Sequence, residues 1–265
     1  MIDPAVLARV PGCEDGRPPR VQRPLPGGRG CNDIRYLETG AGRFVLRTRL
    51  APLQRPGADP LRELACHRAA AAADLAPRVL AAAPDGGWIL MEWLDGRLWR
   101  EADLADAAAI DHLGQRLARL HALAVPAGAP FDALDYARAQ QRLIHEQWPQ
   151  RAAEAARQVE SLYGELAAPT GPPIRAAICH GDLQMANCIG DPLRFVDWEY
   201  AQIADPAYDL ACLLTYYPQL QPHLQRLLAA AGLAGPDDQA RVAAQCRLFA
   251  ILNRLWALAH LTDAG

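Results

Sequence analysis

Two carboxylates and a carboxamide lie close together in one short part of this 265-residue chain. Asp182 and Asn187 belong to the segment I-C-H-G-D-L-Q-M-A-N-C-I, and Asp197 follows in D-W-E with nine residues between it and Asn187. Oxygen ligands in small number suit a Mg²⁺ ion that keeps its waters and shares substrate phosphates. A kinase-type phosphoryl transfer needs this set: one aspartate to accept the proton of the attacking hydroxyl, and an asparagine and a second aspartate to hold metal.

Each of these residues alone could be a turn cap, because Asp and Asn favour turns. Their joint spacing, H-x-D-x-x-x-x-N and then D-W-E, resembles the catalytic signature of aminoglycoside phosphotransferases and choline/ethanolamine kinases, whose fold is similar to that of protein kinases. The resemblance implies that Asp182 is the catalytic base and that Asn187 and Asp197 bind the metal. Glu199 matches the D-W-E form of choline and thiamine kinases and is expected to touch metal or substrate.

The same resemblance implies supporting residues around the loop. His180 is expected to hold the loop in place rather than to take part in the chemistry. In A-D-P-A-Y-D-L-A, Asp209 is expected to brace the loop from the start of a helix, and Asp205 to cap that helix.

A kinase-like N-terminal lobe needs a glycine turn over the phosphates, a cation on the next strand and a helix glutamate to orient that cation. P-G-G-R-G-C-N-D supplies the turn, with Gly28 and Asn32 as candidate cofactor-binding residues. Arg47 in F-V-L-R takes the place of the cation, and Glu63 is its expected partner. The segment W-I-L-M-E-W-L-D-G resembles the hinge, whose backbone from Glu92 to Leu94 is expected to bind adenine.

The chain contains no lysine, so all 27 basic residues are arginine. This composition excludes mechanisms that need a lysine amine, such as a Schiff base or a Walker A phosphate loop. Any cationic phosphate clamp must therefore be arginine, which is permanently charged and bidentate.

The composition around the catalytic segment favours a cationic alcohol as substrate. Residues 180–209 carry one basic residue, Arg194, and six acidic ones, only some of which a metal would neutralise. Aromatic residues, whose faces attract quaternary ammonium or thiazolium groups, cluster in the same half of the chain. They could instead pack in a helical core. The candidate substrate-contacting residues are Glu199, Trp198, Tyr216 and Trp256.

The elements needed to position these residues can be predicted from the pattern of apolar residues. A hairpin turns at G-A-G (residues 40–42), and residues 11–30, rich in Pro, Gly and Arg, are expected to be irregular. The expected fold is α+β and bilobal, with a β-rich N-lobe over residues 1–95 and a helical C-lobe over 96–265. The remaining expected elements are a helix at 60–74, strands at 78–81 and 88–92, a strand-loop-strand segment at 174–196, and helices at 102–124, 132–167, 206–218, 221–232 and 237–262.

The composition also limits partners and location. A net charge of −3 gives no electrostatic reason to expect nucleic acid or an anionic membrane as a partner. The most apolar stretch, Leu64 to Ala83, is interrupted by charges and a proline and is not a membrane span. The seven cysteines are scattered without a C-x-x-C pair and are expected to be reduced and buried, in a cytoplasmic protein.

The sequence therefore predicts an ATP- and Mg²⁺-dependent kinase that phosphorylates a small, cationic alcohol of the choline/ethanolamine or thiamine type. Two alternatives stay open. One is an aminoglycoside or sugar kinase on the same scaffold, and the other is a catalytically silent, nucleotide-binding regulator.

Overall fold

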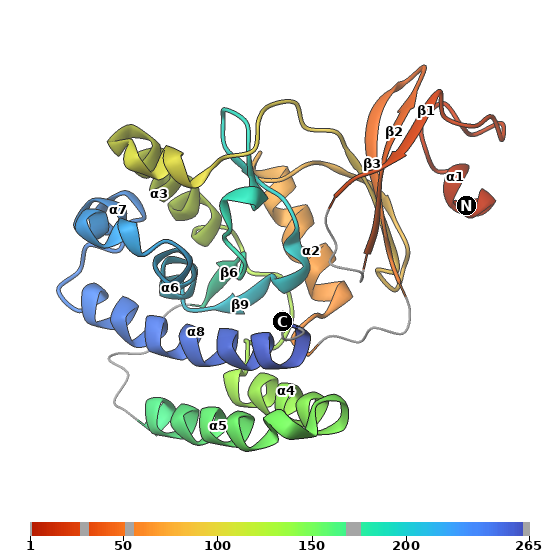
Figure 1. The fold of residues 1–265 in the computed structure, drawn as a ribbon. Coiled ribbons are helices and arrows are strands. Elements are labelled where there is room, and N and C mark those ends of the chain that lie inside the picture. Colours follow the sequence, from red (N-terminus) through yellow and green to blue (C-terminus); the bar gives the residue numbers. More distant parts are fainter. Residues whose placement is uncertain (1, 27–31, 51–55, 168–175, 262–265) are drawn as a thin grey trace.

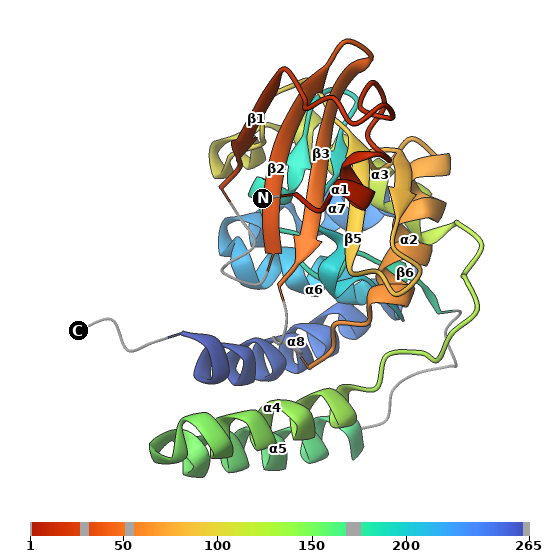
Figure 2. The same cartoon turned by 90° about the vertical axis from the view of Figure 1, so that its right-hand side faces the viewer.

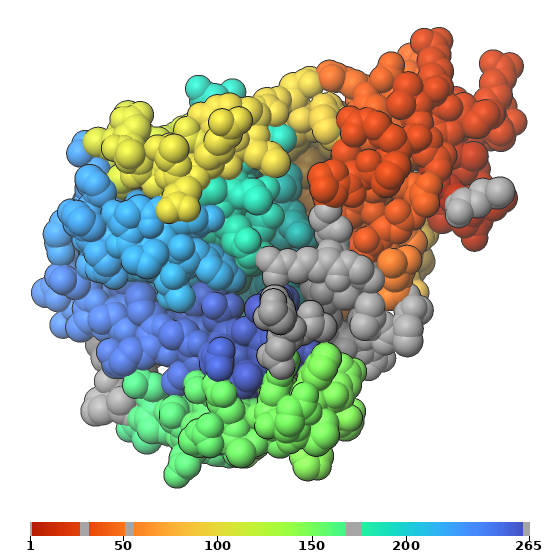
Figure 3. Space-filling model, viewed as in Figure 1, coloured from red at the N-terminus to blue at the C-terminus, as the bar shows by residue number. Residues whose placement is uncertain are grey.

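The N-terminal part of the chain is an antiparallel sheet and the C-terminal part is helical, as a computed structural model shows (Figure 1). The structure describes residues 2–26, 32–50, 56–167 and 176–261. A short helix, α1 (Pro4–Leu7), precedes the sheet. The arrangement confirms the predicted α+β class. In the space-filling view of Figure 3, the N-terminal residues stand beside the larger body formed by the rest of the chain.

The sheet has five strands in the order β1-β2-β3-β5-β4. Alternate residues such as Leu37, Phe44 and Leu46 are buried against a small core, which is why this part of the sequence folds as strands. The strands are β1 (Val21–Pro24), β2 (Asn32–Thr39), β3 (Gly42–Arg49), β4 (Val79–Ala82) and β5 (Trp88–Glu92).

Strand β1 corrects the expectation that residues 11–30 are irregular. All four of its residues are exposed, so it has no alternation of buried and exposed positions that a sequence pattern could reveal. As an edge strand it also tolerates Pro24, since proline cannot donate to a central ladder.

Helix α2 (Pro60–Ala72) lies between the sheet and the helical part (Figures 1 and 2). Pro60 occupies its first turn, and the Asp59 carboxylate accepts the N–H groups of Leu61 and Arg62 at 3.0 and 3.1 Å. Its buried residues Cys66 and Ala70 belong to the core cluster of the C-terminal part. The division into lobes at residue 95 stays a prediction. Helix α2 belongs to the predicted N-lobe but packs against the core of the C-terminal part.

Six helices form most of the C-terminal part. Helix α8 packs against α6 and against the α4–α5 pair, while α7 packs against α3 (Figures 1 and 2). The single range expected to be helical at 132–167 contains two helices, α4 and α5, which are separated at Trp148-Pro149. The helices are α3 (Ala107–His121), α4 (Ala133–Gln147), α5 (Ala152–Ala167), α6 (Ala207–Tyr216), α7 (Leu224–Ala230) and α8 (Asp238–His260).

Two small antiparallel pairs hold the segment with the predicted catalytic residues. Strand β6 (Ala177–Cys179) pairs with β9 (Gln202–Ala204), and β7 (Cys188–Ile189) pairs with β8 (Arg194–Phe195). Strand β9 was not predicted. The described helices are all too short or too polar to cross a membrane. The six described cysteines are free, and all but Cys246 are buried, as predicted.

Candidate active site

The catalytic loop begins directly after β6, where the chain passes very close to the segment that follows Asp197. Gly181 has a φ of +79°, and a Cβ at this position would lie 2.3 Å from the Tyr200 carbonyl oxygen. Only glycine combines this backbone conformation with such a close approach. The loop and the D-W-E segment are therefore held against each other by backbone contact.

Three side chains orient the Asp182 carboxylate. Asn187 Nδ2 donates to Asp182 Oδ2 at 3.1 Å and to its backbone carbonyl at 2.9 Å. Gln184 Nε2 and the Tyr216 hydroxyl donate to Oδ1 at 3.0 and 3.2 Å. Gln184 was not predicted as a site residue, although it lies only two residues after the aspartate. The carboxylate is a fixed acceptor, as a general base must be.

Asn187 and Asp197 lie together at the centre of the site. The Val196 N–H donates to the Asn187 carbonyl at 2.9 Å, which ties the two segments together. Because Nδ2 makes both hydrogen bonds of the Asn187 amide to Asp182, Oδ1 is the atom that can bind a metal. Asp197 has a φ of +62°, an uncommon conformation for a non-glycine residue that often marks a functional site.

Burial raises the pKa of Asp197 to about 7, and the nearby Glu199 and Asp182 add to the increase. Arg47 opposes it, with Nη1 lying 3.8 Å from Asp197 Oδ1. The carboxylates around Asp197 therefore outnumber the positively charged groups, and a bound cation would balance them. The oxygen donors Asn187 Oδ1 and the Asp197 carboxylate fit a Mg²⁺ ion, which would supply that charge.

A hydrogen-bonded frame lies behind the loop. Asp209 accepts the backbone N–H groups of His180 and Gly181 at 3.0 and 2.9 Å, and it also bonds His121 Nε2 at 2.9 Å. His180 Nε2 bonds the Val196 carbonyl at 2.9 Å, and burial lowers the pKa of this imidazole, which is therefore neutral and donates there.

Asp205 lies at the start of α6. Its Oδ1 accepts the Ala207 N–H at 2.9 Å, which is the geometry of a helix cap, and it also faces Arg241 Nη2 at 3.3 Å.

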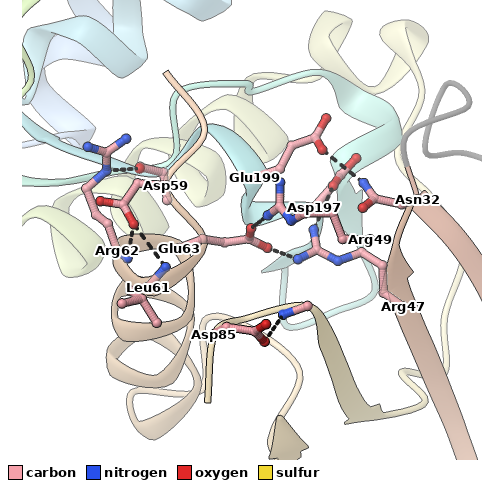
Figure 4. Close-up of polar contacts among 12 residues, drawn as sticks. Asn32, Arg47, Arg49, Asp59, Leu61, Arg62, Glu63, Asp85, Asp197 and Glu199 are labelled. Carbon is pink, nitrogen blue, oxygen red and sulfur yellow. Dashed lines mark hydrogen bonds and ion pairs between the residues drawn. The ribbon is translucent and has the colours of Figure 1, made fainter. Parts of the chain in front are cut away.

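Figure 4 shows the charged cluster on the sheet side of the site. Arg47 bonds Glu63, and Arg49 Nη2 donates to the other oxygen of that carboxylate at 2.8 Å. Burial raises the pKa of Glu63, and the two guanidinium groups lower it. Asn32 Nδ2 donates to Glu199 Oε2 at 3.0 Å, so its amide binds this carboxylate in the structure. Arg49 was not predicted, and Gly28 lies outside the described residues.

A large cavity of about 550 Å³ separates the sheet from the helical part. Arg47 and Glu63 lie on one side of it, and Asn187 and Asp197 on the other. Its remaining walls are mainly apolar. They include Ile34, Val45, Met91, Trp93, Leu94, Ile189 and Val196.

The hinge backbone lines this cavity. The N–H groups of Glu92 and Trp93 donate to the carbonyls of Arg78 and Arg43 at 3.0 and 3.1 Å, while the Leu94 N–H has no partner among the described residues. The Glu92 side chain pairs with Arg78, with Oε2 lying 2.8 Å from Arg78 Nε. Leu94 is the hinge residue whose N–H can take a ligand.

Replacement of His67 by glutamine is expected to reduce the loss of stability at acidic pH. His67 lines the large cavity and donates from Nε2 to the Pro77 carbonyl at 2.8 Å, and burial lowers its pKa from 6.5 to about 4. As the pH falls from 6.5 towards 4, the unfolded state binds a proton that the folded state does not. The folded state therefore loses about 3 kcal/mol over that window.

Urea unfolding of both proteins at pH 6.5 and 4.5 checks this prediction. Glutamine can keep a hydrogen bond to Pro77 but does not titrate, so the variant should lose less stability between the two pH values. Parallel losses would contradict it.

A small cavity of about 230 Å³ lies on the opposite side of Asn187 and Asp197, which line both cavities together with Ala186. Asp182 lines the small cavity only, and Arg47 the large one only. The small cavity is otherwise aromatic and polar. Its other lining residues include Phe131, Tyr136, Gln184, Glu199, Tyr200, Gln202, Tyr208, Tyr216, Phe249, Asn253 and Trp256.

The structure places three of the four predicted substrate-contacting residues on this cavity: Glu199, Tyr216 and Trp256. Trp198 does not line the small cavity. Its side chain is 1% exposed, packs against His67 and His180, and borders the large cavity instead. Apart from Trp256, the lining residues on α4 and α8 were not predicted, because long-range packing brings those helices to the site.

Comparison with solved structures finds proteins of the same fold. A choline/ethanolamine kinase family protein from Mesorhizobium loti is 22% identical, with a TM-score of 0.73 over 97% of this chain and 84% of that one. The choline kinase LicA from Streptococcus pneumoniae is 19% identical, with a TM-score of 0.73 over 96% and 90%. These likenesses confirm the predicted kinase-like fold.

A spectinomycin phosphotransferase, solved with ADP and spectinomycin, is 11% identical, with a TM-score of 0.58 over 92% of this chain and 94% of that one. None of the curated proteins compared matches the chain. The model of the phosphotransferase enzyme family matches residues 21–244, which include the sheet, the catalytic loop and the first residues of α8. The chain therefore belongs to the phosphotransferase enzyme family.

Proposed function

We propose that this protein is an ATP- and Mg²⁺-dependent kinase that phosphorylates the hydroxyl group of a small, cationic alcohol. The observation that carries the proposal is the meeting of two cavities at Asn187 and Asp197, with Asp182 on one side and the Arg47–Glu63 pair on the other. Such an arrangement lets a phosphate donor and an alcohol approach the same point from opposite sides, as in-line transfer requires.

The large cavity suits ATP. Its apolar walls fit a base, and Arg47 supplies positive charge at the phosphate end. The Leu94 N–H, which has no partner among the described residues, offers a hydrogen bond at the hinge. The spectinomycin phosphotransferase, which shares the fold, was solved with ADP. Glycine-turn contacts from Gly28 stay a prediction.

Asn187 and Asp197 would hold Mg²⁺, whose charge offsets that of the transferred phosphates. Asp182, fixed by Asn187, Gln184 and Tyr216, accepts the proton of the alcohol as its oxygen attacks the γ-phosphorus. Arg47, held by Glu63, stabilises the negative charge that develops on the nucleotide phosphates. Asp209 and His180 hold the catalytic loop in position, so the base is in place before substrate arrives.

The small cavity supports a cationic acceptor. Three carboxylates line it, those of Asp182, Asp197 and Glu199, and its described lining residues include no basic side chain. Its rings can lie against an ammonium group, which aromatic faces attract. A volume of about 230 Å³ favours choline, ethanolamine or thiamine types over a multi-ring aminoglycoside.

An ADP-release assay over candidate alcohols tests the proposal. The panel should hold choline, ethanolamine, thiamine, amino sugars and aminoglycosides, each with and without Mg²⁺. The expected result is ADP release that depends on a small cationic alcohol and on the metal. Release only with aminoglycosides or sugars would favour the rival kinase, and binding of ATP without alcohol-dependent release would favour a silent regulator.

A further inference from the structure

One wall of the small cavity is formed by a buried amide that the proposed reaction does not use. Gln202 is the first residue of β9 and pairs with Cys179 of β6, three residues before Asp182. Its side chain lines the cavity, and the residue is only 4% exposed. It therefore lies next to the site of chemistry but outside the catalytic loop.

The Gln202 Nε2 atom is fully buried and has no hydrogen-bond partner in the part of the chain that the structure describes. A buried polar group without a partner destabilises the folded state, so such groups are rare and call for a physical reason. Burial raises the pKa of the Tyr208 hydroxyl well above its usual value, and the neighbouring Gln202 amide opposes that increase, although its Nε2 makes no aligned hydrogen bond there. Since a primary amide carries two N–H donors, at least one of them stays unmatched.

The unmatched donor borders a cavity where the acceptor substrate is proposed to bind. A substrate oxygen at this wall would satisfy it, and a substrate without such an oxygen would leave it buried and unpaired. Sites built in this way discriminate strongly against analogues that lack the hydrogen-bonding group. The carboxylates of Asp182 and Asp197 can bind the ammonium group of the substrate, and the Gln202 amide on β9 can donate to an oxygen of the same molecule.

We propose that Gln202 is a specificity-determining residue whose amide donates a hydrogen bond to a second oxygen of the substrate. The preferred acceptor is then a small cationic alcohol with a further hydroxyl, ether or carbonyl oxygen, such as an aminodiol. This inference rests on the proposed function and narrows its substrate class, since choline and ethanolamine carry one oxygen only.

Matched pairs of acceptors test the inference in the full-length protein. 3-Amino-1,2-propanediol and 1-amino-2-propanol differ by one hydroxyl, as do their N,N,N-trimethyl derivatives. The wild-type protein should favour the diol of each pair by about tenfold or more in kcat/KM. Gln202→Met, which keeps the length of the side chain but removes the amide, should bring this ratio to about one by lowering kcat/KM for the diol alone.

Thermal unfolding separates a binding role from a structural one. Because Gln202→Met removes a buried donor that has no partner, it should leave the melting temperature unchanged or raise it. Gln225→Met is the control for the same substitution away from the site. Gln225 donates to Gln239 Oε1 at 2.9 Å on the surface and does not line the cavity, so its replacement should leave the diol preference intact.

Each other outcome counts against the inference. Equal use of both acceptors by the wild type, or a preference that survives Gln202→Met, overturns it and leaves the proposed kinase activity standing. A Gln202→Met protein that fails to fold shows that the amide is structural, which also overturns it. If no alcohol of any kind supports ADP release, the proposed function falls, and the inference falls with it.

Discussion

Replacement of Asp182 by asparagine is expected to lower turnover about a thousandfold while ATP binding is retained. Asparagine keeps the shape of the side chain but cannot accept the proton of the alcohol, and general-base catalysis contributes about 10²–10⁴ in rate. Asp182 lines the small cavity and does not line the large one, so its loss should not affect the nucleotide. ADP release at saturating substrates measures the first effect, and titration with a fluorescent ATP analogue measures the second.

Asp111→Asn is a suitable control for this experiment. Asp111 is an aspartate on α3 that pairs with Arg226 at 2.7 Å on the surface. Neither residue lines either cavity. Its turnover should stay within about twofold of the wild type, because exposed pairs contribute little. An Asp182→Asn protein with more than a tenth of normal turnover would show that another group takes the proton. Loss of ATP binding in this variant would contradict the separation of the two cavities.

The catalytic loop could be predicted from sequence because its geometry is local. Asp182, Asn187 and Asp197 lie within sixteen consecutive residues, on a loop and the strand pair that follows it, so their spacing nearly determines their distances. Arg47 and Glu63 lie farther apart, and their pairing followed from the order of strand and helix. Arg49 was not predicted, although it could have been, since residues two apart on a strand point to the same face.

The acceptor cavity could not be predicted in the same way. Phe131 lies just before α4 and Tyr136 on it, while Phe249 and Asn253 lie on α8, and only tertiary packing brings these segments to the loop. Trp198 shows the opposite failure. It stands between two site residues, but the turn at Asp197 directs its ring into the core.

Replacement of Glu63 by glutamine is expected to lower the free energy of unfolding by about 3–5 kcal/mol. Glu63 is 1% exposed and binds both Arg47, which is also buried, and Arg49. Removal of its charge leaves two guanidinium groups beside a neutral amide, and an unpaired buried charge carries a penalty of this size. Urea unfolding of both proteins measures the difference.

Glu154→Gln separates burial from the loss of an ion pair as such. Glu154 pairs with Arg254 at 2.6 Å on the surface, so its removal should cost less than about 1 kcal/mol. The double variant Glu63→Gln, Arg49→Gln should recover part of the loss, because one of the two unpaired cations is gone and the sites are coupled. Equal costs for Glu63→Gln and Glu154→Gln would mean that water reaches the Arg47–Glu63 pair. In that case Arg47 would be held in place by solvent-screened contacts, and its fixed position at the phosphate end would lose its physical basis.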